Sequence, residues 1–282
     1  MVAFEIFWFE IYWYWLFYLF SFLIAYCFFY FLARTSYLDN FPNIKNLLKN
    51  WLDDLAVFIL IWIIVWWRLW YVIFYNPSTL LDNPISVFFI WEWWMAFIWW
   101  VIWVILSMLY IAKKYALSIK DFLILMDIIV TILPFWIMLW RIWNFLNQEL
   151  YWKLVSELNI SIIHNNIETL KNLNLIYVYE SIDSNKRINT NFLESIFEWL
   201  VLLLILMFVF FKSIYKSYYK PWFISWLFLI LYWIIRFFIE FLRAPEQVNY
   251  IAWFTSTQYF MFWFIIVWIV LIIWFDKLIQ KK

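Results

Sequence analysis

Glycine is absent from this sequence of 282 residues, although a protein of that length usually contains roughly 20. Tryptophan, by contrast, occurs 26 times and often in doublets, which include Trp66-Trp67, Trp93-Trp94 and Trp99-Trp100. Tryptophan normally gathers in interfacial belts, and close helix contacts favour small residues, so no bilayer rule explains this composition. We hypothesise that most of these tryptophans are glycines encoded by UGA. The codons of the gene decide the matter, because UGG at these positions would refute the hypothesis.

Cysteine, histidine and charge are also scarce, and each scarcity excludes a class of function. The single cysteine, Cys27, excludes an internal disulfide and a multi-cysteine metal site. The single histidine, His164, has no other candidate ligands near it in the sequence, so we expect no metal. No P-loop or Ser-His-Asp pattern is present, and we expect no cofactor. A net charge of +1 gives no reason to expect a nucleic-acid partner.

Long apolar runs dominate what remains, and several reach the ~20 residues that cross a bilayer as a helix. The sequence therefore predicts an all-α polytopic membrane protein with about seven transmembrane helices, embedded in the lipid bilayer. We expect one membrane domain, residues 1–282, with a small external head at about 153–192. The predicted spans are approximately 10–33, 55–75, 87–111, 122–141, 193–211, 222–242 and 258–275.

The lysines and arginines predict the orientation of these spans. Twelve of the twenty basic residues fall in the loops 34–54, 112–121 and 212–220 and in the C-terminal tail. Cytoplasmic loops carry an excess of basic residues. We therefore expect the N-terminus outside and the C-terminus in the cytoplasm.

Three arginines and one aspartate fall within or at the ends of predicted spans, where a charged side chain costs roughly 2.5–3.5 kcal/mol. Arg68 either snorkels to the interface or belongs to a functional site. Asp127 either pairs with an arginine or is a buried structural acid. Arg141 stands at the outer end of the fourth span, within the polar stretch 140–152. Intramembrane arginines at similar depth favour a functional site over chance.

The sixth span places a row of polar residues on one helical face. Their spacing is four, four and three, and they are Tyr232, Arg236, Glu240 and Arg243. A purely structural Arg236–Glu240 pair is one interpretation. However, one carboxylate cannot neutralise two arginines as well as Arg141. The surplus positive charge predicts an anion site, and a lipid phosphate suits the guanidinium fork.

The stretch 140–152, WRIWNFLNQELYW, resembles the signature of bacterial prolipoprotein diacylglyceryl transferases, Gly-Arg-x-Gly-Asn-Phe-x-Asn-x-Glu-x-x-Gly. Every non-glycine position matches, at Arg141, Asn144, Phe145, Asn147 and Glu149. The three glycine positions hold Trp140, Trp143 and Trp152. The stretches 66–76, 91–97 and 232–247 resemble further motifs of the family in the same order, again with tryptophan in place of glycine. Trp13 and Trp91, in contrast, fall where the family itself has tryptophan.

The resemblance implies transfer of a diacylglyceryl group from phosphatidylglycerol to the lipobox cysteine thiol of a prolipoprotein signal peptide. Glycerol phosphate leaves and a thioether remains, in the bacterial plasma (inner) membrane. The predicted catalytic residues are Arg141, Arg236, Glu149 and Tyr232. The predicted substrate-binding residues are Arg141, Asn144, Asn147, Arg68, Glu240 and Arg243.

Two departures from the family pattern leave alternatives open. Ile98 stands where the family has a histidine, and 188–194 keeps only Thr190 and Glu194 of its His-Pro-Ser/Thr-Gln-Leu-Tyr-Glu motif. Thiol activation then relies on the arginines and a carboxylate such as Glu149, or the chain is a weakened or inactive lipid-binding homologue. A small-molecule transporter is a further alternative, although the inverted repeats that would favour it are missing from the sequence.

Overall fold

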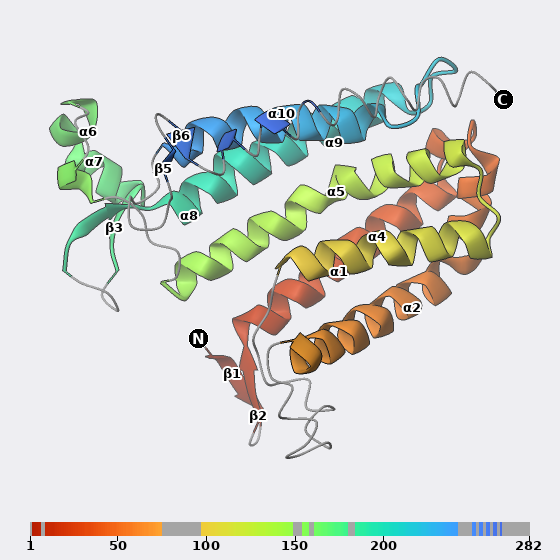
Figure 1. Ribbon diagram of the computed structural model, residues 1–282, viewed down its shortest axis with the longest axis horizontal. Coiled ribbons are helices and arrows are strands. Elements are labelled where there is room, and N and C mark those ends of the chain that lie inside the picture. Colours follow the sequence, from red (N-terminus) through yellow and green to blue (C-terminus); the bar gives the residue numbers. More distant parts are fainter. Residues whose placement is uncertain are drawn as a thin grey trace. The chain divides into compact units, whose positions relative to one another are not determined.

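A computed structural model describes residues 2–6, 9–74, 97–148, 154–157, 161–179 and 184–241, with short pieces between 250 and 266. Its helices and strands are labelled in Figure 1. The chain divides into two compact units. One comprises Met1–Phe28 and Leu123–Lys282, and the other comprises Phe29–Phe122. Each is considered by itself.

The unit Phe29–Phe122 contains two long helices, α2 (Pro42–Phe74) and α4 (Phe97–Lys114), and the short 3₁₀ helix η1 (Ser36–Leu38). Proline at the first position of α2 is favourable, because its fixed φ suits a helix and its missing N–H is not needed there. Phe58 of α2 stacks on Tyr110 of α4 with ring centroids 5.1 Å apart. Leu38, Ile44 and Ile111 are fully or almost fully buried in this unit.

A capping box starts the next helix, α5 (Ile119–Leu146). The Asp121 backbone amide donates to Ser118 Oγ at 3.1 Å, and the Ser118 backbone amide donates to Asp121 Oδ2 at 3.3 Å. Asn43 Nδ2 of α2 donates to the same carboxylate at 3.0 Å. The start of α5 is thus fixed to the start of α2.

The larger unit is built on α1 (Trp13–Arg34) up to Phe28, on α5 from Leu123, and on α8 (Thr190–Leu193), η4 (Glu194–Leu200), α9 (Val201–Ser213) and α10 (Phe223–Glu240). α8, η4 and α9 run on as one continuous helical segment, in which η4 is a π-helix. Leu202, Leu206 and Phe210 are fully buried, whereas Leu204 and Phe208 are 60% and 66% exposed. An apolar surface of this kind suits contact with lipid.

Among the described residues, four helices are long and apolar enough to cross a membrane: Leu16–Arg34, Ile119–Leu146, Thr190–Ser213 and Phe223–Glu240. They coincide with the first, fourth, fifth and sixth predicted spans, so the chain is a mainly helical, multi-pass membrane protein. The second and third predicted spans overlap α2 and α4, and the seventh falls mostly outside the described residues.

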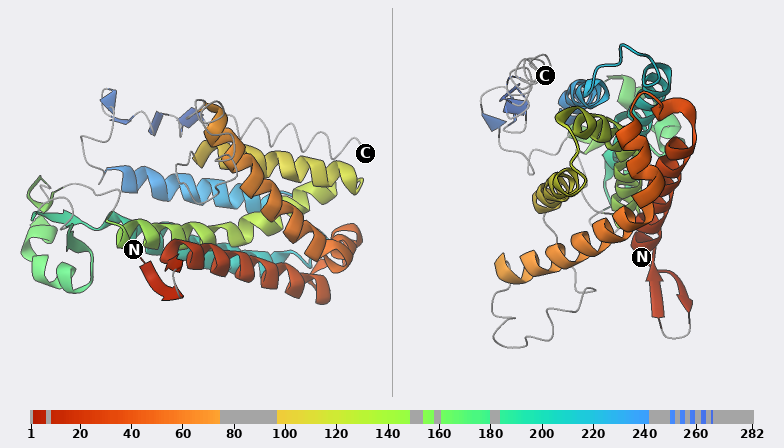
Figure 2. Two further views of the ribbon diagram at one scale, coloured as in Figure 1. Left: turned by 90° about the horizontal axis from the view of Figure 1, so that it is seen from below. Right: turned by 90° about the vertical axis from the view of Figure 1, so that its right-hand side faces the viewer.

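Three short antiparallel hairpins accompany the helices in the described part of the chain, and the sequence patterns did not indicate them. They are β1 (Val2–Ile6) with β2 (Phe9–Tyr12), β3 (Ile176–Val178) with β4 (Lys186–Ile188), and β5 (Tyr250–Ile251) with β6 (Phe254–Thr255). The first projects from the N-terminal end of α1 (Figure 2), so the helix begins at Trp13 and not at residue 10. The second belongs to the predicted head, together with η3 (Val155–Glu157), α6 (Ser161–Asn165) and α7 (Ile167–Asn172).

Asp127 is a fully buried structural acid, which settles the alternative left open by the sequence. Its carboxylate accepts from Tyr219 Oη at 2.6 Å and from the amide and hydroxyl of Ser225 at 2.8 and 2.7 Å. The N-cap residue of α10, Trp222, provides no side-chain cap. The aspartate from α5 therefore supplies the negative charge that the N-terminus of α10 favours. Burial, and then the neighbouring carboxylate, raises the pKa of Tyr219 well above its ordinary range, so the phenol remains a donor.

Asp127→Asn should lower the free energy of unfolding by about 2 kcal/mol, because the amide nitrogen cannot accept from donors that would stay buried. Thermal unfolding in detergent measures the loss. Asp54→Asn, at an exposed position of α2, is the matched control and should leave the midpoint unchanged. Equal midpoints for the two variants would contradict the role assigned to Asp127.

Trp222 has a left-handed backbone, with φ 74° and ψ 5°. A bulky side chain in this region costs roughly 1–2 kcal/mol, whereas glycine has no Cβ to clash. Trp140 and Trp143, which do stand at motif glycine positions, fill the space between α5 and α1. Their ring centroids lie 6.0 Å from that of Tyr18 and 6.5 Å from that of Phe17, respectively. Glycine at these positions would allow closer helix packing. Both observations support the glycine hypothesis.

Trp222→Gly should be more stable than Trp222→Ala by about 1 kcal/mol, since only glycine adopts this φ without strain. Comparing the two variants removes the indole from both sides, so that the difference reports the backbone alone. Thermal unfolding of the pair provides the measurement. An alanine variant as stable as the glycine variant would mean that the turn is not strained.

Candidate functional site

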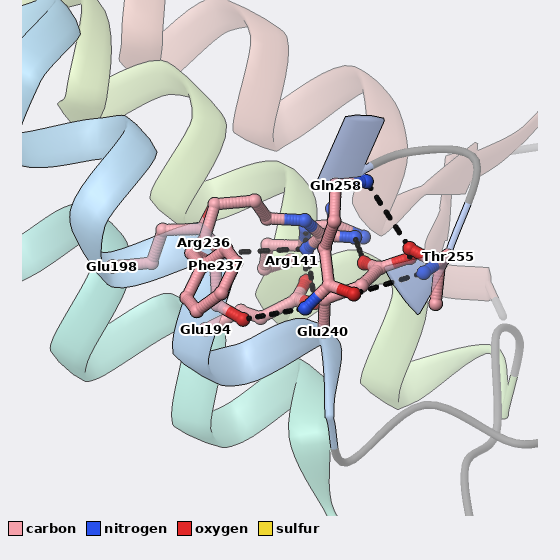
Figure 3. Close-up of polar contacts among 8 residues, drawn as sticks. All are labelled: Arg141, Glu194, Glu198, Arg236, Phe237, Glu240, Thr255 and Gln258. Atoms are coloured by element: carbon pink, nitrogen blue, oxygen red, sulfur yellow. Dashed lines mark hydrogen bonds and ion pairs between the residues drawn. The ribbon is translucent and has the colours of Figure 1, made fainter. Parts of the chain in front are cut away.

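Five charged residues meet where α5, η4 and α10 come together (Figure 3). Arg141 comes from the C-terminal part of α5. Glu194 and Glu198 lie four residues apart in η4, and Arg236 and Glu240 lie four apart in α10, so each pair shares a helical face. Ser195 Oγ donates to the Met138 carbonyl at 3.4 Å and helps to hold η4 against α5.

Glu194 joins the two arginines. Its Oε2 lies 2.7 Å from Arg141 Nε, and its Oε1 accepts from Arg236 Nη1 at 2.7 Å. Arg236 Nη2 also donates to Glu240 Oε2 at 3.1 Å, so the pair that was one interpretation of the spacing in the sixth span is present. The two guanidinium groups therefore belong to one site, on two different helices.

The two arginines are held differently. Arg236 donates aligned hydrogen bonds from both Nη atoms, and its side chain is 10% exposed. The Arg141 side chain is 19% exposed, and among the described residues its Nε makes the Glu194 ion pair without an aligned hydrogen bond. Arg236 is thus the anchored cation, and Arg141 is the one more available to a ligand.

The charge balance corrects one expectation. Two guanidinium groups face three fully buried carboxylates, those of Glu194, Glu198 and Glu240. Among the described residues of this cluster the predicted surplus of positive charge is therefore wrong, while Arg243, which the prediction also counted, lies outside them. The sequence argument counted only Glu240 because the other two glutamates lie some forty residues earlier, at the start of an apolar span. Burial of this many charges is tolerable only because they are paired.

A segment beyond α10 closes one side of the site. Thr255 Oγ1 donates to Glu240 Oε1 at 3.4 Å, and the Thr255 amide donates to Gln258 Oε1 at 2.9 Å. Gln258 Nε2 donates to the Phe237 carbonyl at 3.3 Å. Both side chains are buried, so the segment is bound to α10 through polar contacts (Figure 3). Within the described residues, no group of three or more His, Cys, Asp or Glu side chains could hold a metal ion.

The comparison with known families decides the assignment, since a family model described as prolipoprotein diacylglyceryl transferase matches residues 1–274. The chain belongs to the prolipoprotein diacylglyceryl transferase family. The resemblance of the 140–152 signature to this family is thereby confirmed.

Three relatives named phosphatidylglycerol–prolipoprotein diacylglyceryl transferase show the extent of the similarity. The Teredinibacter turnerae protein is 35% identical over 115 residues, which are 41% of this chain and 39% of that protein. The Rickettsia canadensis protein is 32% identical over 156 residues, 55% of this chain and 53% of the relative. The Rickettsia bellii protein is 30% identical over 182 residues, 64% and 61% respectively. These alignments thus span between 39% and 61% of the relatives' length.

Residues 140–148 of the family signature form the C-terminal end of α5 and the turn after it, and the rest of the signature lies outside the described residues. Asn144 is buried three residues beyond Arg141, on the same side of the helix. Asn147 lies in the turn, where its backbone N–H donates to the Trp143 carbonyl at 3.0 Å. Gln148 follows with φ 56°. The polar residues are thus grouped where the helix stops.

Of the other predicted site residues, one lies beside this cluster and the rest fall wholly or partly outside the described residues. Tyr232 is one turn before Arg236, and its ring contacts Trp199 at 5.3 Å and stacks on Phe228 at 5.9 Å. Arg68 is in α2, but its side chain lies outside the described part. Glu149 and Arg243 also fall outside the described residues.

Asn189, which sequence reasoning missed, attaches the head to the helix that carries Glu194. Its Oδ1 accepts from the Phe192 amide as the N-cap of α8 and from Tyr179 Oη, both at 3.2 Å. Its Nδ2 donates to the Asn174 carbonyl at 2.9 Å. Burial raises the pKa of Tyr179 well above its usual range, so the phenol remains a donor.

Proposed function

We propose that this family member transfers the diacylglyceryl group of phosphatidylglycerol to the lipobox cysteine of prolipoproteins. The observation that carries the proposal is the meeting of Arg141 and Arg236 on one buried carboxylate, in a chain of this family. The cysteine sulfur attacks the glycerol carbon, the bond from that carbon to the phosphate oxygen breaks, and glycerol phosphate leaves. A thioether to the peptide remains.

Arg141 stabilises the departing phosphate in this proposal. It is the more exposed arginine of the site, and a guanidinium fork binds phosphate oxygens in pairs. Arg236, held by Glu194 and Glu240, fixes the position of the carboxylate against which Arg141 rests. Preorganised cations of this kind in a dry site give large stabilisation of developing negative charge.

The remaining predicted residues complete the proposed site. Asn144, Asn147 and Glu149 orient the head group or hold Arg141, since all three belong to the same signature at the end of α5. On the opposite wall, Tyr232 serves catalysis, and Glu240 and Arg243 bind the substrate. Arg68 is a further substrate-binding residue in this proposal.

We further propose one membrane domain with seven spans in the bacterial inner membrane and an external head at about 153–192. The four apolar helices support four of these spans. The lysine and arginine distribution supports an N-terminus outside and a C-terminus in the cytoplasm. The site then lies toward the outer leaflet, next to the head.

The test is release of glycerol phosphate from phosphatidylglycerol by the chain made in the form that its codons specify, tryptophan or glycine. A lipobox peptide with cysteine should support release, and the same peptide with serine should not. Release with neither peptide would contradict the proposal.

A lipid-binding homologue without transferase activity is the second candidate, because the carboxylates of the cluster outnumber its guanidinium groups and position 98 is isoleucine. It predicts that phosphatidylglycerol binds without release of glycerol phosphate in the presence of the cysteine peptide.

A further inference from the structure

Glu198 is the one member of the cluster that the proposed chemistry leaves without a task. Its side chain is fully buried, and neither carboxylate oxygen accepts a hydrogen bond from any described residue. Its ion pair is a long one, 3.7 Å from Glu198 Oε2 to Arg236 Nη1. Glu194, in contrast, has two arginine nitrogens at 2.7 Å. A buried carboxylate with only this one long ion pair is unfavourable, since desolvation of a charge costs several kcal/mol and a distant partner offsets little of it.

The backbone around Glu198 departs from an ordinary α-helix. Glu198 lies within the π-helix η4, where the Val201 amide donates to the Ile196 carbonyl five residues earlier. π-Turns inside helices occur frequently at functional sites. Glu194 and Glu198 both lie close to Arg236 of α10, as Figure 3 shows.

Glu198 can be protonated without disturbing the other ion pairs of the cluster. Arg236 and Tyr232 face it from α10, Arg141 from α5, and Glu194 from its own helix. Because Glu194 and Glu240 already pair with the guanidinium groups, protonation of Glu198 leaves neither arginine without a close carboxylate. The same is not true of Glu194, whose protonation would weaken both of its 2.7 Å contacts.

We propose that Glu198 accepts the proton of the lipobox cysteine thiol, an inference that rests on the proposed transfer. The S–H bond breaks and its proton passes to a Glu198 carboxylate oxygen. The freed sulfur electron pair forms the C–S bond, and the C–O electron pair leaves with the phosphate as the glycerol phosphate anion. The leaving phosphate or solvent then takes the proton back from Glu198. This assigns to Glu198 the activation of the thiol that the sequence suggested for Glu149.

A selenocysteine lipobox peptide tests the assignment, because a selenol ionises at neutral pH without help. Glu198→Gln should lower kcat for the cysteine peptide at pH 7 by roughly 10²–10⁴-fold, as loss of a general base does, with KM almost unchanged. The selenocysteine peptide should keep most of its rate. The cysteine rate should also recover as the pH approaches the thiol pKa of about 8.5.

The ratio of the two peptide rates on one sample does not depend on how much protein is folded. Glu198→Asp keeps a carboxylate, so its ratio should stay closer to that of the unsubstituted chain. This holds even if the variant folds poorly. Glu168→Gln, an exposed glutamate in the head, should change neither rate.

Three results would overturn the inference: an unchanged ratio in Glu198→Gln at every pH, an unchanged cysteine rate, or a selenol-rescued defect in Glu149→Gln instead. Failure of the unsubstituted chain with both peptides would instead contradict the proposed transfer itself.

Discussion

Replacing Arg141 by alanine should lower kcat/KM for transfer by about 10³-fold, which is the upper range for removing one preorganised donor from a developing negative charge. Arg141 is the more exposed of the two arginines, and its one described ion pair is made through Nε. Initial rates of glycerol phosphate release over a range of phosphatidylglycerol concentrations provide the measurement.

Two controls separate charge from geometry at this position. Arg141→Lys keeps the charge but loses the planar fork, so its rate should fall between those of the original and the alanine variant. Lys171→Ala removes an exposed cation of the head and should leave the rate unchanged. If Arg141→Ala releases glycerol phosphate as fast as the unsubstituted chain, Arg141 does not bind the phosphate.

Replacing Glu194 by glutamine should lower the free energy of unfolding by about 3–5 kcal/mol, the usual loss when one partner of a buried ion pair is removed. Two guanidinium groups lose their shortest carboxylate contacts at once, while the shape of the side chain is preserved. Transfer should be lost as well, because Arg141 would no longer be held beside Arg236.

Thermal unfolding in detergent measures this loss, with Glu157→Gln at an exposed position of the head as the matched control. The double variant Glu194→Gln with Arg141→Ala should be less destabilised than the sum of the two single variants, because the residues are in contact. Additive losses, or a Glu194→Gln midpoint equal to that of the control, would show that the bridge contributes nothing.

Much of the fold could be predicted because apolar runs reveal membrane helices directly. The first, fourth, fifth and sixth predicted spans agree with described helices to within about five residues at each end. The hairpins could not be predicted, since two- to five-residue strands produce no detectable alternation. Nor could the π-helical turn at 194–200, which differs from an α-helix in one hydrogen-bond step that no composition encodes.

Only those features of the site that depend on residues within one helix could be predicted from the sequence. Arg141 and Arg236 stand out as charges in apolar helices. The four-residue spacing from Arg236 to Glu240 suggested that these two side chains form a pair. The bridge from Glu194 to Arg141 depends on how η4 packs on α5, which no pattern within either helix contains. A signal for the other acids was present nonetheless: Glu194 and Glu198 lie four residues apart at the start of an apolar span, as costly there as any arginine.

Asp127 illustrates the same limit from the structural side. Its burial was foreseeable from its position in an apolar run, but its partners Tyr219 and Ser225 lie almost a hundred residues later. Sequence alone therefore left it between a pair with arginine and a structural acid. Only the packing of α10 against α5 distinguishes the two.

The position of the phosphate in a structure with bound phosphatidylglycerol tests the central claim most directly. The account predicts phosphate oxygens at about 2.7–2.9 Å from the guanidinium group of Arg141, the usual length of a charge-assisted hydrogen bond, with Arg236 still bound to Glu194. A phosphate bound elsewhere on the chain, with both arginines closed on Glu194 and no lipid beside them, would contradict it.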